Sequence, residues 1–187
     1  MQPATEQHYS RVEYLAMEET ANVRHEFFQG QFFAMSGGTF NHAVLSGNVY
    51  FVLKTKLREQ PCQPLNSDMR IHTPAGLDTY PDVSVYCGQP ELMDNNKTLL
   101  NPVVIIEVLS PTTRNYDQGE KFRLYRSIPS LQDYLLIDSE RVEVTHFRKL
   151  ENAEWLLHEY TVISDIISLQ AFEQQLSLAE IYENVHF

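Results

Sequence analysis

The arrangement of hydrophobic and polar residues predicts helices and a hairpin in the first third of the chain. Residues Ser10–Glu13 have the spacing of a capping box and predict a helix over Arg11–Glu19. Two short apolar runs on either side of Gln29-Gly30 predict a β-hairpin over His25–Met35. A longer helix is predicted over Phe40–Glu59, because its apolar residues recur at helical spacing after a threonine that can cap it.

The middle of the chain has strand patterns. Val103–Leu109 is an almost unbroken run of β-branched and other apolar residues, which is typical of a central strand covered on both faces. Tyr80–Cys87 alternates, so Asp82 is expected on the opposite face from Val83 and Val85. Further strands are predicted at residues 68–73, 133–138, 141–147 and 154–162.

The remaining helices complete the expected fold. Asp117 and Glu120 have capping-box spacing and predict a helix that starts near Asp117 and ends before Pro129, and a short final helix is predicted over Ser177–Glu183. The order of elements predicts a mixed β-sheet flanked by helices, in the α/β (mixed α+β) class. A length of 187 residues suits a single domain spanning the chain.

Composition narrows the class of protein. The apolar stretches are too short to cross a bilayer and Met1–Ser10 is polar, so we expect a soluble, cytoplasmic protein without a membrane partner. The two cysteines, Cys62 and Cys87, form no CxxC pair. They are expected to be small apolar residues in or beside strands, rather than part of a zinc ribbon or a disulfide framework.

The formal net charge of −11, from 14 basic and 25 acidic residues, weighs against a basic face that grips phosphates without regard to sequence. A protein of this charge that acts on phosphate groups would need a bound metal, a few local cations or a partner. The chain also lacks the HExxH, GxSxG and P-loop patterns, which removes three common kinds of hydrolase site.

Glu107 is the residue whose position most needs a chemical explanation. Its neighbours in the strand run are all apolar, and burying an unpaired carboxylate is costly, so such a group is usually paired or holds a cation. A salt bridge to an arginine at the end of a strand is an equally open explanation.

Asp82 and Lys121 are less informative alone. Solvent exposure or turn chemistry explains an aspartate after a proline, and a surface pair with Asp117 four residues earlier explains Lys121. Together with Glu107 they become specific, because two carboxylates on neighbouring strands can hold Mg²⁺ or Mn²⁺. A lysine on the next helix can then stabilise the charge that develops on a phosphate.

These segments resemble a known family. Tyr80–Val85, Val104–Thr112 and Asp133–Asp138, with Lys121 and Tyr125 between the last two, resemble the Uma-two family of restriction-endonuclease-like proteins, which are abundant in cyanobacterial genomes. The resemblance covers almost the whole chain. It implies the PD-(D/E)XK nuclease fold, a divalent-metal-dependent activity on DNA and, by analogy of fold, a homodimer.

The resemblance also implies roles for individual residues. Asp82 is the motif aspartate, Glu107 the motif acid, and the backbone carbonyl of Val108 a further metal ligand. The chain departs from the superfamily pattern at Leu109, where a lysine is expected, and Lys121 on the following helix is its replacement.

Four other residues match the family pattern less decisively. Glu26 either completes the site from the hairpin or is an exposed strand charge. His42 either acts in catalysis or contacts only its own helix end. Asp68 either approaches the motif aspartate or serves a turn, and Tyr125 is expected to pack against the sheet.

The leading prediction is a Mg²⁺- or Mn²⁺-dependent endonuclease that acts on DNA. The rival is a nuclease-fold module that no longer cuts and instead binds a partner or forms homo-oligomers, which the charge of −11 and the departure at Leu109 favour. A metal-dependent hydrolase of small phosphate esters is a third reading.

Overall fold

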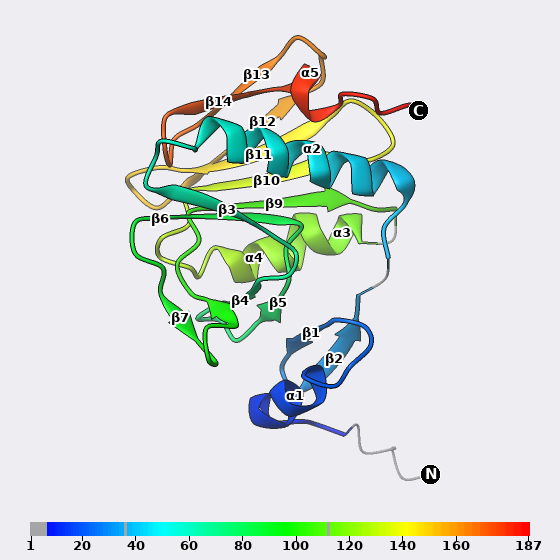
Figure 1. Ribbon diagram of the computed structural model, residues 1–187, viewed down its shortest axis with the longest axis vertical. Coiled ribbons are helices and arrows are strands. Elements are labelled where there is room, and N and C mark those ends of the chain that lie inside the picture. Colours follow the sequence, from blue (N-terminus) through cyan, green and yellow to red (C-terminus); the bar gives the residue numbers. More distant parts are fainter. Residues whose placement is uncertain (1–6, 36, 112) are drawn as a thin grey trace.

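The computed structural model describes residues 7–35, 37–111 and 113–187, and its central feature is a six-stranded mixed sheet (Figure 1). The strand order is β12-β11-β10-β9-β6-β3. The strands are β3 (Cys62–Asn66), β6 (Val83–Cys87), β9 (Val104–Leu109), β10 (Asp133–Asp138), β11 (Val144–Lys149) and β12 (Trp155–Tyr160). Because β9 and β10 are parallel and β6 and β9 antiparallel, the predicted mixed sheet is confirmed.

A second sheet is built from short strands in the order β2-β1-β5-β4-β8-β7. They are β1 (His25–Phe28), β2 (Gln31–Ala34), β4 (Arg70–His72), β5 (Asp78–Thr79), β7 (Leu92–Met93) and β8 (Thr98–Leu99). The predicted hairpin is confirmed as β1 and β2. The prediction of one sheet was incomplete, since strands of two or three residues are too short to show an alternating pattern.

The helices are α1 (Arg11–Glu18), α2 (Phe40–Lys56), α3 (Arg114–Tyr116), η1 (Asp117–Lys121), α4 (Phe122–Tyr125) and α5 (Leu178–Ile181). The predicted caps are confirmed: Ser10 closes a capping box on α1, and the Thr39 side chain accepts the His42 amide at the start of α2. The predicted start at Asp117 was wrong. The helix begins at Arg114, and Asp117 instead opens the π-helical turn η1.

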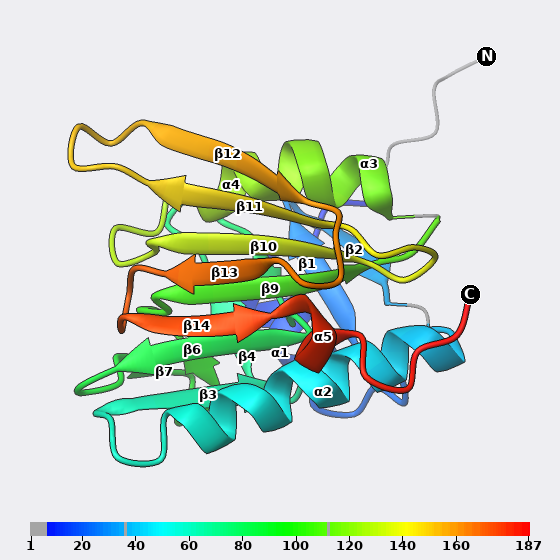
Figure 2. The same ribbon diagram turned by 90° about the horizontal axis from the view of Figure 1, so that it is seen from above.

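Helices cover the central sheet on both faces (Figures 1 and 2). On one face, α2 packs through Leu45 and Val49 onto a core that includes Ile106. On the other face, α4 packs through Tyr125 onto a core that includes Ile105. Since side chains alternate along a strand, the residues two and four positions beyond Ile105 in β9 also face α4.

A two-stranded hairpin, β13 (Ile166–Leu169) with β14 (Gln174–Ser177), packs with α5 against the α2 side of the core. Figure 2 shows this hairpin lying over β9, with β13 toward β10 and β14 toward β6. The sequence analysis did not predict these strands. Among the described residues, no helix is long and apolar enough to cross a membrane.

The two cysteines lie in strands, as expected, but they also form a disulfide, which corrects the expectation of none. The antiparallel register of β3 and β6 places Cys62 directly opposite Cys87. The sequence analysis did not predict β3, which contains Pro64, because proline is confined to edge strands and weakens the pattern. Without β3, the two cysteines had no visible reason to be neighbours.

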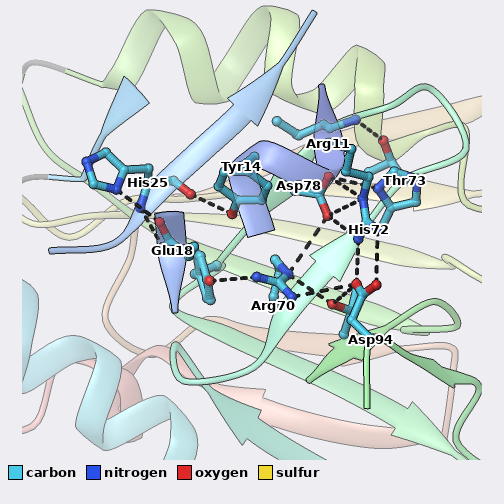
Figure 3. A network of polar contacts seen from close by, with 12 residues as sticks. Arg11, Tyr14, Glu18, His25, Arg70, His72, Thr73, Asp78 and Asp94 are labelled. Atoms are coloured by element: carbon cyan, nitrogen blue, oxygen red, sulfur yellow. Dashed lines mark hydrogen bonds and ion pairs between the residues drawn. The ribbon is translucent and has the colours of Figure 1, made fainter. Parts of the chain in front are cut away.

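A buried polar network ties α1 to the second sheet (Figure 3). The Arg11 guanidinium lies 2.8 Å from Asp78 Oδ1 and 2.6 Å from Asp94 Oδ2. The Asp78 side chain is fully buried, and Arg70 Nε lies 3.9 Å from it. Asp78 immediately precedes Thr79 in β5, so this network fixes the strand that reaches the site described below.

We expect Arg11→Ala to lower the free energy of unfolding by about 2–3 kcal/mol, because it removes one of the partners of a buried carboxylate. Arg70 remains near Asp78 and limits the loss. The matched control is Arg123→Ala, since Arg123 is 53% exposed in a surface ion pair with Glu120 and should contribute little to stability. Urea denaturation measures both. Equal losses in the two variants would contradict a structural role for the network.

Candidate functional site

The structure brings the carboxylates of Glu26 and Glu107 to one buried lysine. Glu107 lies on the face of β9 that α4 covers, two residues after Ile105. The π-helical turn of the crossover helix directs Lys121 to the same face, where its Nζ lies 2.8 Å from Glu107 Oε1 and 2.8 Å from Glu26 Oε1. π-Helical turns inside helices frequently occur at functional sites.

Asp82 lies beside Glu107 at the start of the neighbouring strand. The antiparallel register pairs Val83 with Ile106, which places the preceding residue, Asp82, opposite Glu107. The backbone N–H of Asp82 donates to Glu107 Oε2 at 3.4 Å. The Val108 N–H donates to Asp82 Oδ2 at 2.7 Å. Since the N–H and C=O of a strand residue point to the same edge, the Val108 carbonyl is also expected to face Asp82.

Glu26 is held by its own set of partners on the hairpin side. Thr79 Oγ1 donates to Glu26 Oε1 at 2.6 Å, from the strand that the buried network fixes. Burial alone would raise the pKa of Glu26, but Lys121 and the Thr79 hydroxyl lower it below the usual value for glutamate. Glu26 is therefore a buried, ionised partner of Lys121 rather than an exposed strand charge.

Lys121 is buried and surrounded by acids. Its Nζ also lies 3.5 Å from Asp117 Oδ1, one turn earlier in the same helix. Burial would lower its pKa, but Glu107, Tyr125, Glu26 and Asp117 together raise the pKa well above that of a free lysine. Lys121 consequently remains a cation at neutral pH and can act as a fixed positive charge.

Burial destabilises the charged form of Glu107, as expected for a carboxylate in an apolar strand. Burial in the apolar strand raises the pKa of Glu107 to about 8, even though Lys121 stabilises its charged form. Asp117 and Asp82 add to the rise because they are further negative charges nearby. Without another cation the site has more carboxylates than Lys121 can offset.

Tyr125 packs in the core under the sheet, as predicted, and it also contacts the site. Its hydroxyl donates to Glu107 Oε1 at 2.7 Å. The ring is fully buried, so the contact is protected from water. Tyr125 therefore positions Glu107 from below and leaves the other carboxylate oxygen, Oε2, on the side of Asp82.

We expect Tyr125→Phe to destabilise the fold by about 1–2 kcal/mol, because Glu107 Oε1 loses one of two hydrogen-bond donors while Lys121 remains. The DNA cleavage predicted from the sequence should fall by less than about tenfold, since the variant removes only a positioning contact. Thermal unfolding and cleavage rates measure the two effects. A loss of cleavage as large as that of a Glu107 variant would show that Tyr125 acts directly in the reaction.

His42 and Asp68 are placed differently. His42 Nε2 lies 3.2 Å from Asp82 Oδ2, and this hydrogen bond raises the pKa of His42. Asp68 is not brought to the site: its side chain is 72% exposed in an ion pair with Arg24. The Asp68 N–H donates to the Asn66 side chain, so turn chemistry explains this residue.

The site lines a pocket of about 490 Å³. Its polar side carries Glu26, His42, Asp82, Glu107, Asp117 and Lys121. Its other side is formed by Phe28 and by residues 33–35 of the β1–β2 hairpin. The pocket lies where β6 and β9 meet the crossover helix, and its volume is within the usual range for small-molecule sites.

Comparison with known proteins identifies the family. The model of the Uma2 family, described as "Putative restriction endonuclease", matches residues 11–180. The chain belongs to the Uma2 family. The Synechocystis sp. protein slr1290, described as uncharacterized, is 38% identical over 176 residues, which cover 94% of this chain and 92% of that protein. A second uncharacterized Synechocystis sp. protein, sll1609, is 37% identical over 158 residues, which cover 83% of this chain and 89% of that protein.

A solved structure supports the Uma2 fold. The crystal structure of a putative nuclease belonging to DUF820, from Anabaena variabilis, superposes with a TM-score of 0.77 at 16% sequence identity. The match covers 93% of this chain and 97% of that one. At this identity the likeness establishes the fold, and the expected nuclease-like mixed sheet flanked by helices is confirmed. Membership in Uma2 places the chain in a family described as "Putative restriction endonuclease".

The donor atoms of the candidate site suit a hard divalent cation. Among the described residues, no three His, Cys, Asp or Glu side chains are grouped so as to hold a metal ion. Asp82 and Glu107 supply two carboxylates. Lys121 and Tyr125 contact Glu107 at Oε1, and Val108 contacts Asp82 at Oδ2, whereas Glu107 Oε2 has the longer 3.4 Å contact with the Asp82 N–H. Mg²⁺ is usually bound by one or two carboxylates together with waters and substrate phosphates, so two carboxylates are sufficient.

Asp117, Tyr116 and Thr79 were not predicted to lie beside the candidate site residues. Asp117 was interpreted as a helix cap with a surface partner, yet it is buried beside Lys121. Tyr116 lines the same pocket, and the centroid of its ring lies 6.0 Å from Lys121 Nζ. The spacing of four residues from Asp117 to Lys121 was the available signal, but spacing alone does not say which face of a helix is buried.

Proposed function

We propose that this Uma2 protein is a divalent-metal-dependent endonuclease that hydrolyses phosphodiester bonds in DNA. The observation that carries the proposal is the buried cluster in which Asp82 and Glu107 lie side by side and Lys121 Nζ lies 2.8 Å from Glu107. A lysine that only stabilises the fold through an ion pair needs a single carboxylate partner. Here Lys121 has three carboxylate partners within 3.5 Å and opens onto a pocket.

Asp82, Glu107 and the Val108 carbonyl would hold Mg²⁺ or Mn²⁺ through oxygen atoms. When bound, the cation lowers the pKa of a coordinated water and neutralises charge that develops on the scissile phosphate. The raised pKa of Glu107 supports this assignment, because a second cation near Glu107 would stabilise its charged form.

The chain's own residues perform the remaining steps. Lys121 is held as a cation and can donate hydrogen bonds to a phosphate oxygen or orient the attacking water. Glu26 and Asp117 keep the lysine charged and fix its direction. His42 orients Asp82, which lies 3.2 Å away, as Tyr125 orients Glu107.

Plasmid cleavage at low salt, with Mg²⁺ or Mn²⁺ and with or without EDTA, tests the proposal. We expect nicked or linear plasmid with metal, and intact supercoiled plasmid with EDTA. Hydrolysis of a small model diester without any DNA cleavage would instead indicate a hydrolase of small phosphate esters. If neither substrate is cut in either metal, the chain is a nuclease-fold module that no longer cuts.

A further inference from the structure

The two faces of the β1–β2 hairpin have different surroundings. On one face, Phe27 stacks on Tyr14 of α1 with ring centroids 4.8 Å apart, and Phe32 lies 5.7 Å from the same ring. On the other face, Glu26 and Phe33 are direct cross-strand partners. Since directly opposed residues of an antiparallel pair point to the same face, Phe33 lies on the side of the hairpin that carries Glu26 to Lys121.

Phe33 is not used by the core. Its side chain is 47% exposed and lines the pocket, together with Ala34 and the half-buried Met35. Phe28, two residues after Glu26, continues this apolar wall but packs partly against the core below. An aromatic ring is therefore held at the edge of the pocket, on the strand face that also supplies a site carboxylate.

The charges around the pocket are unfavourable for a continuous duplex. Its lining contains five acidic residues, and among the described lining residues Lys121 is the sole lysine or arginine. Duplex binding draws much of its affinity from lysines and arginines that neutralise many phosphates. Single-stranded nucleic acid can instead gain affinity from bases that stack on aromatic side chains.

We propose that Phe33, supported by Met35, is a stacking platform for a nucleobase next to the scissile phosphate, so that the enzyme prefers single-stranded DNA or single-stranded flaps to continuous duplex. In a duplex each base already stacks on its neighbours and is paired, so its face cannot reach a ring at the edge of the pocket. This inference rests on the proposed nuclease function. It adds the substrate form and the residue that selects it.

The test compares Mn²⁺-dependent cleavage of one oligonucleotide sequence as a single strand, as a flap and as a duplex. Wild type should cut the single strand and the flap about ten- to a hundredfold faster than the duplex, and Phe33→Ala should bring this ratio close to one. Phe33→Trp should preserve the ratio. Phe51→Ala is the matched control, because Phe51 is 70% exposed on α2 and away from the pocket.

A second measurement separates binding from hydrolysis. Fluorescence anisotropy of a labelled single strand, measured on Glu107→Gln with and without Phe33→Ala, should show weaker binding in the double variant. Equal cleavage of all three DNA forms, or a ratio unchanged by Phe33→Ala, would overturn the stacking proposal while leaving the nuclease function intact. Failure of wild type to hydrolyse DNA and a small model diester alike would overturn the nuclease function itself, and with it the inference.

Discussion

Glu107→Gln is expected to abolish DNA cleavage, with a loss of at least about a thousandfold, because metal-assisted charge stabilisation contributes several kcal/mol to the transition state. The amide has nearly the same shape as the carboxylate, so Tyr125 can still donate to its oxygen. Because burial raises the pKa of Glu107, the neutral amide costs less to bury than the carboxylate. The fold should therefore persist.

Stability as a function of pH gives an independent readout of the same variant. Folding raises the pKa of Glu107 from 4.5 to about 8, so the folded state binds the proton more tightly than the unfolded state. In the metal-free wild type, stability from this residue is present below about pH 4.5 and is lost as the pH rises through about 8. Glu107→Gln should remove this loss.

The matched control for Glu107→Gln is Glu159→Gln, which changes an exposed glutamate in the edge strand β12. We expect wild-type cleavage and wild-type stability from this variant. Cleavage by Glu107→Gln at the rate of Glu159→Gln would remove Glu107 from the reaction.

The second large effect is expected from Lys121→Met, which should lower cleavage by about a hundredfold or more, comparable to the loss of one oxyanion donor. It should also destabilise the protein by about 3–5 kcal/mol, because Glu26, Glu107 and Asp117 lose their shared buried cation. Cleavage rates and urea denaturation measure the two effects. Lys97→Met is the matched control, since Lys97 is 58% exposed and pairs with Glu19 on the surface.

A double variant separates the electrostatic role of Lys121 from general packing. Lys121→Met combined with Glu107→Gln should recover part of the lost stability, because the amide no longer needs a cation. Cleavage should stay abolished in this double variant. Strictly additive stability losses would mean that Lys121 and Glu107 do not interact as the 2.8 Å contact implies.

Long apolar strands could be predicted from the sequence, whereas very short strands could not. Val103–Leu109 is long and strongly apolar, so both its strand and the anomaly of Glu107 were visible. The strands β5 and β8 have two residues each and carry no periodicity. β3 was not predicted because it contains a proline. Without this strand in the prediction, nothing indicated that Cys62 and Cys87 are close enough to form a disulfide.

A site residue could be predicted where it departs from the hydrophobic pattern of its strand, and it could not where it fits an ordinary structural pattern. Glu107 is a carboxylate in an apolar strand, and it led to Asp82 and Lys121. Asp117 fits the spacing of a helix cap, so nothing in the sequence indicated that it is buried beside Lys121. Asp68 has an acidic side chain near a predicted strand, but only the structure shows its surface pair with Arg24.

Asp82 and Glu107 together are expected to hold a divalent cation, and the proposed activity requires it. Calorimetric titration of Mn²⁺ into wild type and into Asp82→Asn tests this without any substrate. We expect saturable Mn²⁺ binding by wild type and its loss in Asp82→Asn, with both proteins folded. Equal binding by the two proteins, or none by wild type, would contradict the metal site and favour a nuclease-fold protein that no longer cuts.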